Sequence, residues 1–453
     1  IQALGKKEEV SMVITGKKRW FVLVIVSLMA GVMVYVPFLR YSYYDQMVML
    51  FSEYKSVASA ANVNEFIGDF SFWFGLVCTI GYPIGGILVD KFGEKWLLII
   101  GSVMMGACSF WFGLVPDKLS IIIIHVLYGV GTSFFIWNAY LKTTRKMGNA
   151  SEQGSMFSTS EFVRAIMGML LGFLGVALLN RAIMPGNATD LQVLGAQWRN
   201  MLFFNGALFL VLAVIVFFVV PNNIIGAEDA ELAASGKAAL TQEKLTAASV
   251  LKVLKMPGTW LLSLLIFFCF SFTSAANGYL GSYTVNVLGI SQTQASTFAV
   301  VRNYIIAGLA TLAIGFIADK IGSKVKTLGY YLAIATVLTV AVLVTKNTAF
   351  LCIGVTFVFA VVYTGMRGIY FATLGEVGIP LSLTGVATGV ISLICYLPDV
   401  YFAKLAGIWL DKYGKFGYDL IWYWVIGCGI LGILVAFISV RYSKKLKAEG
   451  KVQ

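Results

Sequence analysis

The chain has 453 residues, of which 59% are hydrophobic and 12% are charged, and its formal net charge is +12. A soluble domain carries about 25% charged residues, so this composition excludes an ordinary soluble protein. The apolar residues form continuous runs such as 208–220, whereas the strands of an outer-membrane β-barrel alternate in polarity. The basic excess indicates loops that face an anionic membrane leaflet rather than nucleic acid binding.

Twelve stretches are long and apolar enough to cross the hydrocarbon core, which takes about 20 residues of α-helix. The first six spans are predicted at 20–44, 66–89, 96–115, 119–141, 156–180 and 200–220. The last six are predicted at 258–283, 293–318, 327–345, 348–371, 385–410 and 419–441. We therefore predict an all-α integral membrane protein with twelve transmembrane helices in two halves, at 20–220 and 258–441, joined by a polar cytoplasmic linker at 221–257.

Lysine and arginine are unevenly distributed over the predicted loops. They concentrate in the N-terminal segment 1–19, the linker, the C-terminal tail 442–453 and the loops after spans 2, 4 and 8. Since basic residues stay on the cytoplasmic side, both termini are predicted to be cytoplasmic. We expect a multi-pass protein of the cell's inner (plasma) membrane.

One sequence pattern follows both span 2 and span 8, and it marks two candidate gate loops. Its glycines permit a tight turn between packed helices. Its aspartate can cap a helix or pair with a basic residue, and so lock one conformation. The predicted gate-loop residues are Gly86, Asp90, Lys91 and Gly93 in the first loop, and Gly315, Asp319, Lys320 and Gly322 in the second.

These two loops resemble the signature loop of the major facilitator superfamily. The resemblance implies two pseudo-symmetric six-helix halves, alternating access, and a solute site between the halves near mid-membrane, lined by spans 1, 4, 7 and 10. It carries almost no information about the substrate.

A finer resemblance connects spans 1, 5 and 11 with the organophosphate–phosphate antiporters. In span 11 the similar residues are Gly385-Val-Ala-Thr-Gly389, Tyr396-Leu397 and Gly407-Ile-Trp-Leu-Asp411. In span 5, Arg164 and Gly168 occur where those proteins place a substrate-site histidine before glycines.

Two further resemblances concern cations within the predicted spans. Arg40 is similar to the first-helix arginine of the phosphate clamp in those antiporters. The second arginine of that clamp would fall near Ala276 or Asn277 in span 7, where this chain has no arginine. Arg302 and Lys404 resemble the cationic pair of oxalate–formate exchangers.

A charge at bilayer depth costs several kcal/mol unless it is paired or hydrated, so each predicted intramembrane charge is a functional candidate. Glu161 and Arg164 lie one turn apart on one helix face. They are predicted either to bind an anion, with Glu161 holding the arginine or carrying a proton, or to form an internal ion pair. Arg367 lies among the glycines and tyrosines of span 10, and a place in the cavity is favoured over snorkelling to the cytoplasmic face.

The other intramembrane charges leave more than one interpretation open. Asp399 follows Pro398, where proline should bend span 11. Asp399 is predicted either to titrate and couple transport to protons or to neutralise a nearby arginine, and the second is favoured. Lys404 lies about 140° further round that helix, so it is a poor partner for Asp399. Arg40 and Arg302 are placed toward the outer ends of their spans, and for Arg302 snorkelling to the outer interface is favoured.

The embedded cations outnumber the embedded acids, which suits a carboxylate, sugar acid or phosphate ester, because arginine binds such groups through paired hydrogen bonds. We therefore predict a secondary transporter of a small organic anion that works as an antiporter or a proton symporter. The predicted substrate-binding residues are Arg164, Arg367, Arg40, Tyr363, Tyr396, Trp137 and Asn138. The predicted coupling or ion-pair residues are Glu161, Asp399 and Lys404.

Two alternatives stay open, a transport-inactive sensor on the same fold and a proton-coupled drug exporter, although the arginines oppose the second. No enzyme, cofactor or metal is predicted, because the sequence has no nucleotide-binding loop, metal cluster or catalytic triad. The six cysteines lack paired spacing and are predicted to be small buried residues. The expected partners are a small anionic solute, membrane lipid, and protons or an exchanged anion. No nucleic acid is expected, and the protein is expected to be a monomer.

Overall fold

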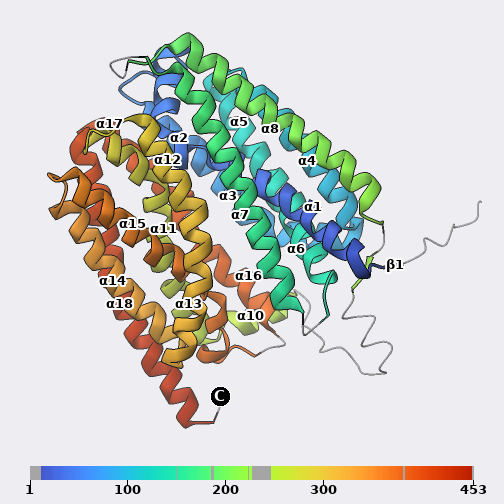
Figure 1. Ribbon diagram of the computed structural model, residues 1–453. Helices are drawn as coiled ribbons and strands as arrows, with labels where there is room; N and C mark the ends of the chain where they lie inside the picture. The colour runs from blue at the N-terminus through green and yellow to red at the C-terminus, as the bar shows by residue number, and fades with distance from the viewer. Residues whose placement is uncertain are drawn as a thin grey trace, which may run out of the picture.

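A computed structural model describes residues 12–149, 152–184, 188–222, 224–226, 246–380 and 383–450. Within these residues the chain is almost entirely helical (Figure 1). Eleven helices in this part of the chain are long and apolar enough to cross a membrane. The remaining predicted span is formed by three consecutive helical segments between Gln292 and Ile321. The predicted all-α membrane fold is therefore confirmed.

The first half begins with a short strand, β1 (Met12–Val13), which pairs in parallel with β2 (Ile224–Ile225) after the last helix of this half. This pairing holds the two ends of the half together. Its helices are α1 (Gly16–Tyr35), η1 (Val36–Phe38), α2 (Arg40–Met49), η2 (Leu50–Tyr54), α3 (Val63–Phe92), α4 (Glu94–Gly113), α5 (Lys118–Val130), η3 (Gly131–Ile136), α6 (Trp137–Lys146), α7 (Gln153–Leu179), η4 (Asn180–Ala182) and α8 (Leu191–Val219).

The second half follows a short helix, α10 (Ala247–Leu254), in the predicted linker, of which residues 227–245 lie outside the described part of the chain. Its helices are α11 (Pro257–Asn286), α12 (Gln292–Val300), η5 (Val301–Ile306), α13 (Ala307–Ile321), α14 (Lys324–Val344), α15 (Ala349–Met366), η6 (Phe371–Thr373), η7 (Gly375–Val377), α16 (Thr384–Cys395), α17 (Leu397–Tyr413) and α18 (Lys415–Ala448).

The predicted boundaries of five spans are wrong by five residues or more. Span 4 ends at Lys146 instead of residue 141, span 6 begins at Leu191 instead of residue 200, and span 12 ends at Ala448 instead of residue 441. The first span runs from Gly16 to Tyr54 instead of ending at residue 44, because its second part carries polar side chains that face protein rather than lipid. Gln46, for example, is buried. In span 10, α15 ends at Met366 instead of continuing to residue 371. Gly365 and Gly368 flank this end, and each glycine disfavours a helix by about 1 kcal/mol relative to alanine.

Four spans contain irregular turns in their interior, among them the fourth, where the π-helical turn η3 lies between α5 and α6. Pro398 lies at the start of α17, directly after the break at Tyr396 between α16 and α17, so the predicted bend in span 11 is confirmed. The first span breaks at η1, which contains Pro37. The eighth predicted span contains a π-helical turn, η5, between α12 and α13. Such π turns widen a helix locally and are frequent at functional sites.

The two halves are packed tightly at one end, which we call the closed end and define by Asn64, Gly68, Lys404 and Gly407. A Cβ atom added at Gly68 in α3 would lie 2.5 Å from the Lys404 Cα and 2.6 Å from the Ala403 carbonyl oxygen in α17. The absence of a side chain therefore allows the two backbones to approach each other directly, as small residues do at membrane helix interfaces.

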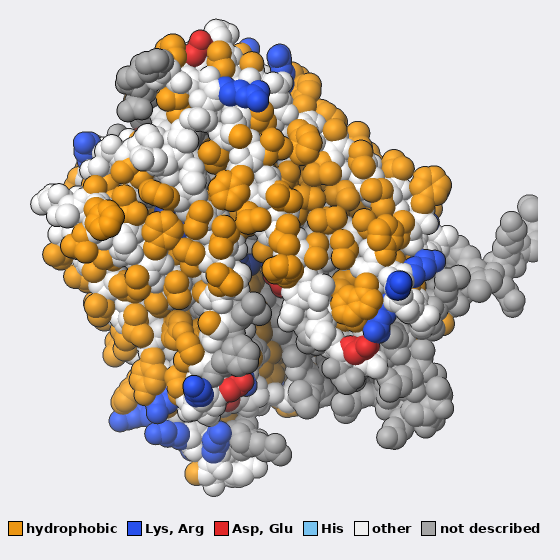
Figure 2. Space-filling model, viewed as in Figure 1, with side chains coloured by type: hydrophobic (Ala, Val, Ile, Leu, Met, Phe, Trp, Pro, Cys, Tyr) orange, Lys and Arg blue, Asp and Glu red, His pale blue; other side chains and the backbone are white. Residues whose placement is uncertain are grey.

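Away from the closed end the two halves diverge (Figure 1). On the face that Figure 2 shows, the surface is hollowed between them, and the flanks of both halves are covered by apolar side chains. The apolar flanks are the surface expected to face lipid, so the hollow lies between two membrane-embedded lobes.

We predict that Gly68→Val separates the halves at the closed end, because the new side chain would clash with the backbone of α17. Spin labels on Ala60→Cys and Lys415→Cys should move apart, as measured by pulsed electron paramagnetic resonance. The control is Gly389→Val, where an added Cβ meets no atom within 4 Å. An unchanged label distance in Gly68→Val would contradict tight backbone packing at this end.

Candidate functional site

Arg40 lies inside the protein rather than toward the outer end of its span. Because the first span continues to Tyr54, Arg40 at the start of α2 falls well within it, and its side chain is buried. Its Cζ lies 4.7 Å from the ring centroid of Tyr41 and 5.9 Å from that of Tyr279. These cation–π contacts stabilise the charge in part, but Arg40 Nη1 has no hydrogen-bond partner in the described structure.

Asp399 lies close to this arginine from the other half of the protein. It occupies the first turn of α17, where the positive end of the helix dipole favours a carboxylate. Ser274 Oγ donates a hydrogen bond to Asp399 Oδ1 at 2.7 Å. Arg40 and Arg367 both act electrostatically on Asp399. No ion pair found among the described residues includes Asp399, so its role as a counter-ion for nearby arginines stays a prediction.

Glu161 and Arg164 form an ion pair within α7, as their spacing predicts. The Arg164 Cζ lies 5.5 Å from the ring centroid of Trp137. Glu161 is half exposed, so this pair is hydrated on one side. It lies in the first half of the protein.

Arg367 faces the same region from the second half. It is exposed at the C-terminal end of α15. The charges of Glu161 and Asp399 and the ring of Tyr396 all act on it electrostatically. The two halves thus bring Arg40, Arg164 and Arg367 toward a common region, which we call the central site, together with Glu161, Tyr396 and Asp399.

Three of the predicted site residues have other partners. Asn138 Nδ2 donates to the Tyr82 and Ser133 carbonyl oxygens at 3.1 and 3.0 Å, which packs α6 against α3. Lys404 Nζ lies 2.8 Å from Asp69 Oδ1. Tyr363 is buried and donates to Asn277 Oδ1 at 2.8 Å.

The prediction that Arg302 snorkels to the outer interface is wrong. Its side chain is 1% exposed and lies in η5, where Tyr363 interacts with it. Hydropathy cannot distinguish a cation that reaches for the interface from one that is enclosed by neighbouring helices.

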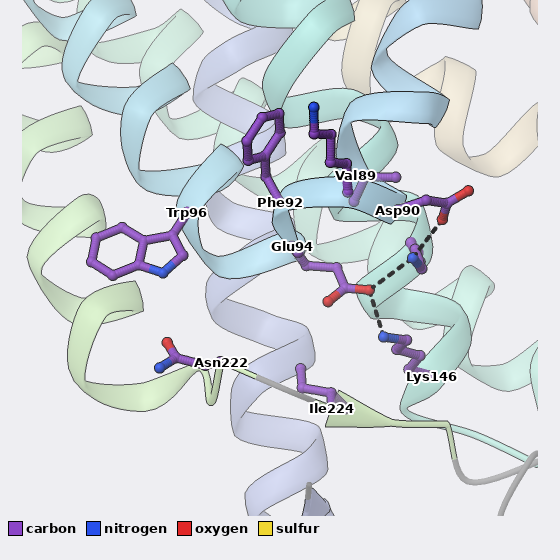
Figure 3. A pocket seen from close by; sticks show the side chains of 11 residues that line it. Val89, Asp90, Phe92, Glu94, Trp96, Lys146, Asn222 and Ile224 are labelled. Carbon is purple, nitrogen blue, oxygen red and sulfur yellow. Dashed lines mark hydrogen bonds and ion pairs between the residues drawn. The ribbon is translucent and has the colours of Figure 1, made fainter. Parts of the chain in front are cut away.

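The first gate loop is held within its own half. Lys142 Nζ lies 2.7 Å from Asp90 Oδ1, and Lys146 Nζ lies 2.6 Å from Glu94 Oε1 (Figure 3). These residues line a pocket of about 560 Å³ together with Lys91, Phe92, Gly93, Trp96, Asn222 and Ile224. Asp90 is largely exposed, so in this structure it does not fasten one half to the other.

The second gate loop is held by a carboxylate that sequence reasoning missed. Glu376, in η7, accepts hydrogen bonds from Ser323 Oγ at 2.7 Å and from the Lys324 backbone N–H at 2.6 Å. It therefore caps the start of α14. Gly322 has φ +72°, and Gly93 in the first loop has φ +78°, so both glycines form the tight turns that the repeated pattern predicts.

Three carboxylates that were not predicted as site residues join the halves at the closed end. Asp411 Oδ2 accepts from the Glu65 backbone N–H at 2.7 Å, and its Oδ1 accepts from Asn64 Nδ2 at 2.7 Å. Asp45 Oδ1 accepts from Ser282 Oγ at 2.8 Å and Asn286 Nδ2 at 2.7 Å.

The third carboxylate is Asp69, which pairs with Lys404. A signal for Asp411 was present in the span 11 motif, whereas Asp45 was overlooked because the first span was ended one residue before it.

We predict that Asp411→Asn weakens the closed end more than Lys404→Gln. Asp411 makes charge-assisted hydrogen bonds to the start of α3, each of which contributes about 1.5–3 kcal/mol. The Lys404–Asp69 pair is partly exposed, and such pairs contribute about 0.2–1 kcal/mol.

The fraction of molecules open at the closed end, from the same spin-label distances, should rise roughly tenfold or more in Asp411→Asn and less than about fivefold in Lys404→Gln. A larger effect of Lys404→Gln would contradict this ranking.

Comparison with known proteins supplies a family assignment. A family model described as "Major Facilitator Superfamily" matches residues 21–403. Two Escherichia coli K12 proteins are similar over nearly the whole length of this chain. Inner membrane protein YqcE is 24% identical, over 96% of this chain and 97% of its own length. Inner membrane protein YihN is 23% identical, over 96% and 99%.

Solved structures show the same fold. A bacterial homologue of the human lysosomal transporter Spinster, in an inward-facing and unoccupied conformation, has a TM-score of 0.70 at 13% identity, over 95% of this chain and 99% of that one. The E. coli xylose transporter XylE, in a partially occluded inward-open conformation, has a TM-score of 0.66 at 15% identity, over 94% and 98%. At these identities the comparison concerns the fold and not the substrate.

Proposed function

Since the chain belongs to the Major Facilitator Superfamily, we propose that the solute it moves across the membrane by alternating access is a small organic anion. The candidates are a carboxylate, a sugar acid or a phosphate ester. The inner-membrane proteins to which it is similar support a place in the inner membrane.

The observation that carries this proposal is the convergence of three arginines on one region between the halves. Arg40 and Arg164 come from the first half, Arg367 comes from the second, and the carboxylates of Glu161 and Asp399 lie among them. Three fixed positive charges against two carboxylates leave an excess that an anionic solute can neutralise. Guanidinium groups bind carboxylate and phosphate oxygens through paired hydrogen bonds.

The arrangement of the halves fits one state of an alternating-access cycle. With the N-terminus in the cytoplasm, as the basic loops predict, the closed end is the outer face and the hollow opens inward. In this state Asp90 is bound within its own half. We propose that Asp90 and Asp319 act in the closing of the inner face rather than in solute binding.

Asp399 gives the central site a means of coupling. In the empty site its carboxylate offsets part of the charge of Arg40 and Arg367. A solute anion that binds these arginines competes with Asp399, so binding is favoured when Asp399 takes up a proton or when another anion leaves. Proton symport and anion exchange both follow from this competition.

The solute class is tested by competition. We predict that uptake into proteoliposomes, or ligand-dependent thermal stabilisation of the purified protein, responds to small carboxylates, sugar acids or phosphate esters. Lipophilic cations should have no effect, because they would add positive charge to a region already rich in arginine. Competition by quaternary amines with no response to any of these anions would remove the proposal.

We also predict that Arg164 and Arg367 bind the solute jointly, one from each half. Loss of one charged hydrogen bond costs about 1.5–3 kcal/mol, or roughly 10- to 150-fold in affinity. Arg164→Lys and Arg367→Lys should each approach this loss, since lysine keeps the charge but not the planar fork. The measurement is ligand affinity in detergent, with Arg441→Lys on the exposed surface of α18 as the matched control.

The melting temperature separates binding from structure for Arg164. If Arg164 served only to pair with Glu161, Arg164→Ala would lower the melting temperature and the double variant Glu161→Gln/Arg164→Gln would restore it. Normal affinity in both lysine variants would place the solute elsewhere.

A further inference from the structure

Two exposed cations lie on neighbouring helices at one end of the second half. Lys326 is in the first turn of α14, and Arg441 is near the end of α18. No ion pair found among the described residues includes either side chain. On the face that Figure 2 shows, basic side chains gather at this end of the second half, below its apolar flank. With the N-terminus in the cytoplasm, as the basic loops predict, this is the cytoplasmic end.

Each of the two cations lies over an aromatic ring one turn away on its own helix. Lys326 Nζ is 5.6 Å from the ring centroid of Tyr330, and Arg441 Cζ is 4.2 Å from that of Phe437. Both rings are about half exposed, at 49% and 54%. Exposed aromatic rings of this kind are typical of the membrane–water interface. The cation–π contacts therefore keep the two positive charges at the level of the lipid headgroups.

The packing of α14 against α18 places both cations on one side of the helix pair. A Cβ added at Gly329 would lie 3.1 Å from the Ala436 Cβ, which marks the contact between the two helices. Lys326 lies about 60° round α14 from Gly329, and Arg441 lies about 140° round α18 from Ala436 in the same sense. Because the two helices run in opposite directions, the same sense of rotation leads to the same side. Counted from this contact, the two Cα atoms differ in height by only about 3 Å.

Towards the middle of the membrane, the same side of the helix pair is apolar and exposed. Ile334 and Val337 continue this side on α14, and Ile430 and Leu434 continue it on α18. Each of these four side chains is 47–68% exposed. The surface thus has two cations at the interface and an apolar surface below them. A phospholipid has the matching order, from its charged headgroup to its acyl chains.

The corresponding helices of the first half lack this pair of cations. Lys95 lies in the first turn of α4, as Lys326 does in α14, and its Nζ is 4.8 Å from the ring centroid of Phe217 in α8. The helix α8 ends at Val219, and its one basic residue, Arg199, lies towards its other end. General attraction between a basic cytoplasmic face and the membrane would act on both halves. Two cations on adjacent helices distinguish the second half from the first.

We propose that Lys326 and Arg441, together with Tyr330 and Phe437, bind the headgroup of an anionic phospholipid whose acyl chains lie along α14 and α18. Ammonium and guanidinium groups donate charge-assisted hydrogen bonds to phosphate oxygens. Basic sites between membrane helices on the cytoplasmic side are suited to such headgroups. This inference concerns a surface outside the central site and does not depend on which solute is transported.

A lipid at this site would join two helices that enclose the second gate loop. Glu376 caps the start of α14 through the Lys324 backbone N–H. A Cβ added at Gly378, two residues further on, would lie 2.8 Å from Leu446 Cδ1 in α18. The segment that holds the gate loop is therefore packed between the two helices that the headgroup would bridge. We expect the bound lipid to stabilise this end of the second half.

The test compares dioleoyl phosphatidylglycerol with dioleoyl phosphatidylcholine, which have the same acyl chains. Affinity for the first bound lipid is measured by native mass spectrometry on the full chain in detergent. We expect wild type to bind the anionic lipid about tenfold or more tightly than the zwitterionic one. Lys326→Gln and Arg441→Gln should each lower the affinity for phosphatidylglycerol by roughly fivefold, and the double variant by about 25-fold. Phosphatidylglycerol should also raise the melting temperature of wild type but not of the double variant.

The matched control is Lys95→Gln, which removes a lysine from the same helix position in the first half. It should change the affinity for phosphatidylglycerol less than about twofold. An equal loss in Lys95→Gln and in the two site variants would mean that overall charge attracts the lipid, and would overturn the site. Unchanged affinity in the double variant would overturn it as well.

A soluble headgroup analogue separates a lipid from a free phosphate ester. Glycerol 1-phosphate has the charged group without acyl chains, so it should not displace phosphatidylglycerol from wild type. Displacement that is lost in the double variant would mean that Lys326 and Arg441 bind a soluble phosphate ester, and would overturn the proposal of a lipid site.

Discussion

The structure depends on one constraint, which is that a positive charge inside a membrane protein requires compensation from its neighbours. The buried arginines obtain it in different ways. Arg164 has a carboxylate one turn away and an aromatic ring beneath it, and Arg40 has two tyrosine rings and the more distant Asp399. Arg302 has a phenol. The three arginines therefore differ in how much of their charge is compensated by the protein.

The contacts at the closed end show a second use of carboxylates. They join the halves through helix N–H groups, amides and a lysine, beside the packed backbones of α3 and α17. Polar contacts of this kind can be replaced by hydrogen bonds to water when the halves separate. Charge thus attracts the solute in the centre of the molecule and holds the halves together at its end.

The sequence predicted the spans well because a helix that faces lipid must be apolar over its length. It was less accurate where a helix faces protein, since polar residues such as Gln46 are then tolerated, and the first span was cut short as a result. The repeat predicted the tight turns at Gly93 and Gly322. The pairing of Glu161 with Arg164 was predictable from local spacing. The partners of Lys404 and Arg302 were not, because Asp69 and Tyr363 lie on other helices and no periodicity brings them together.

The glycine-lined contact between α3 and α17 has an energetic consequence of its own. Two backbones that touch without side chains between them bury little apolar area when they meet, and each Å² contributes only about 25 cal/mol. Few rotamers are frozen on contact or released on separation. The closed and open arrangements of this end should therefore lie close in free energy. A transporter that must visit both states in every cycle needs such a balance. A leucine-rich interface between α3 and α17 would instead favour the closed state.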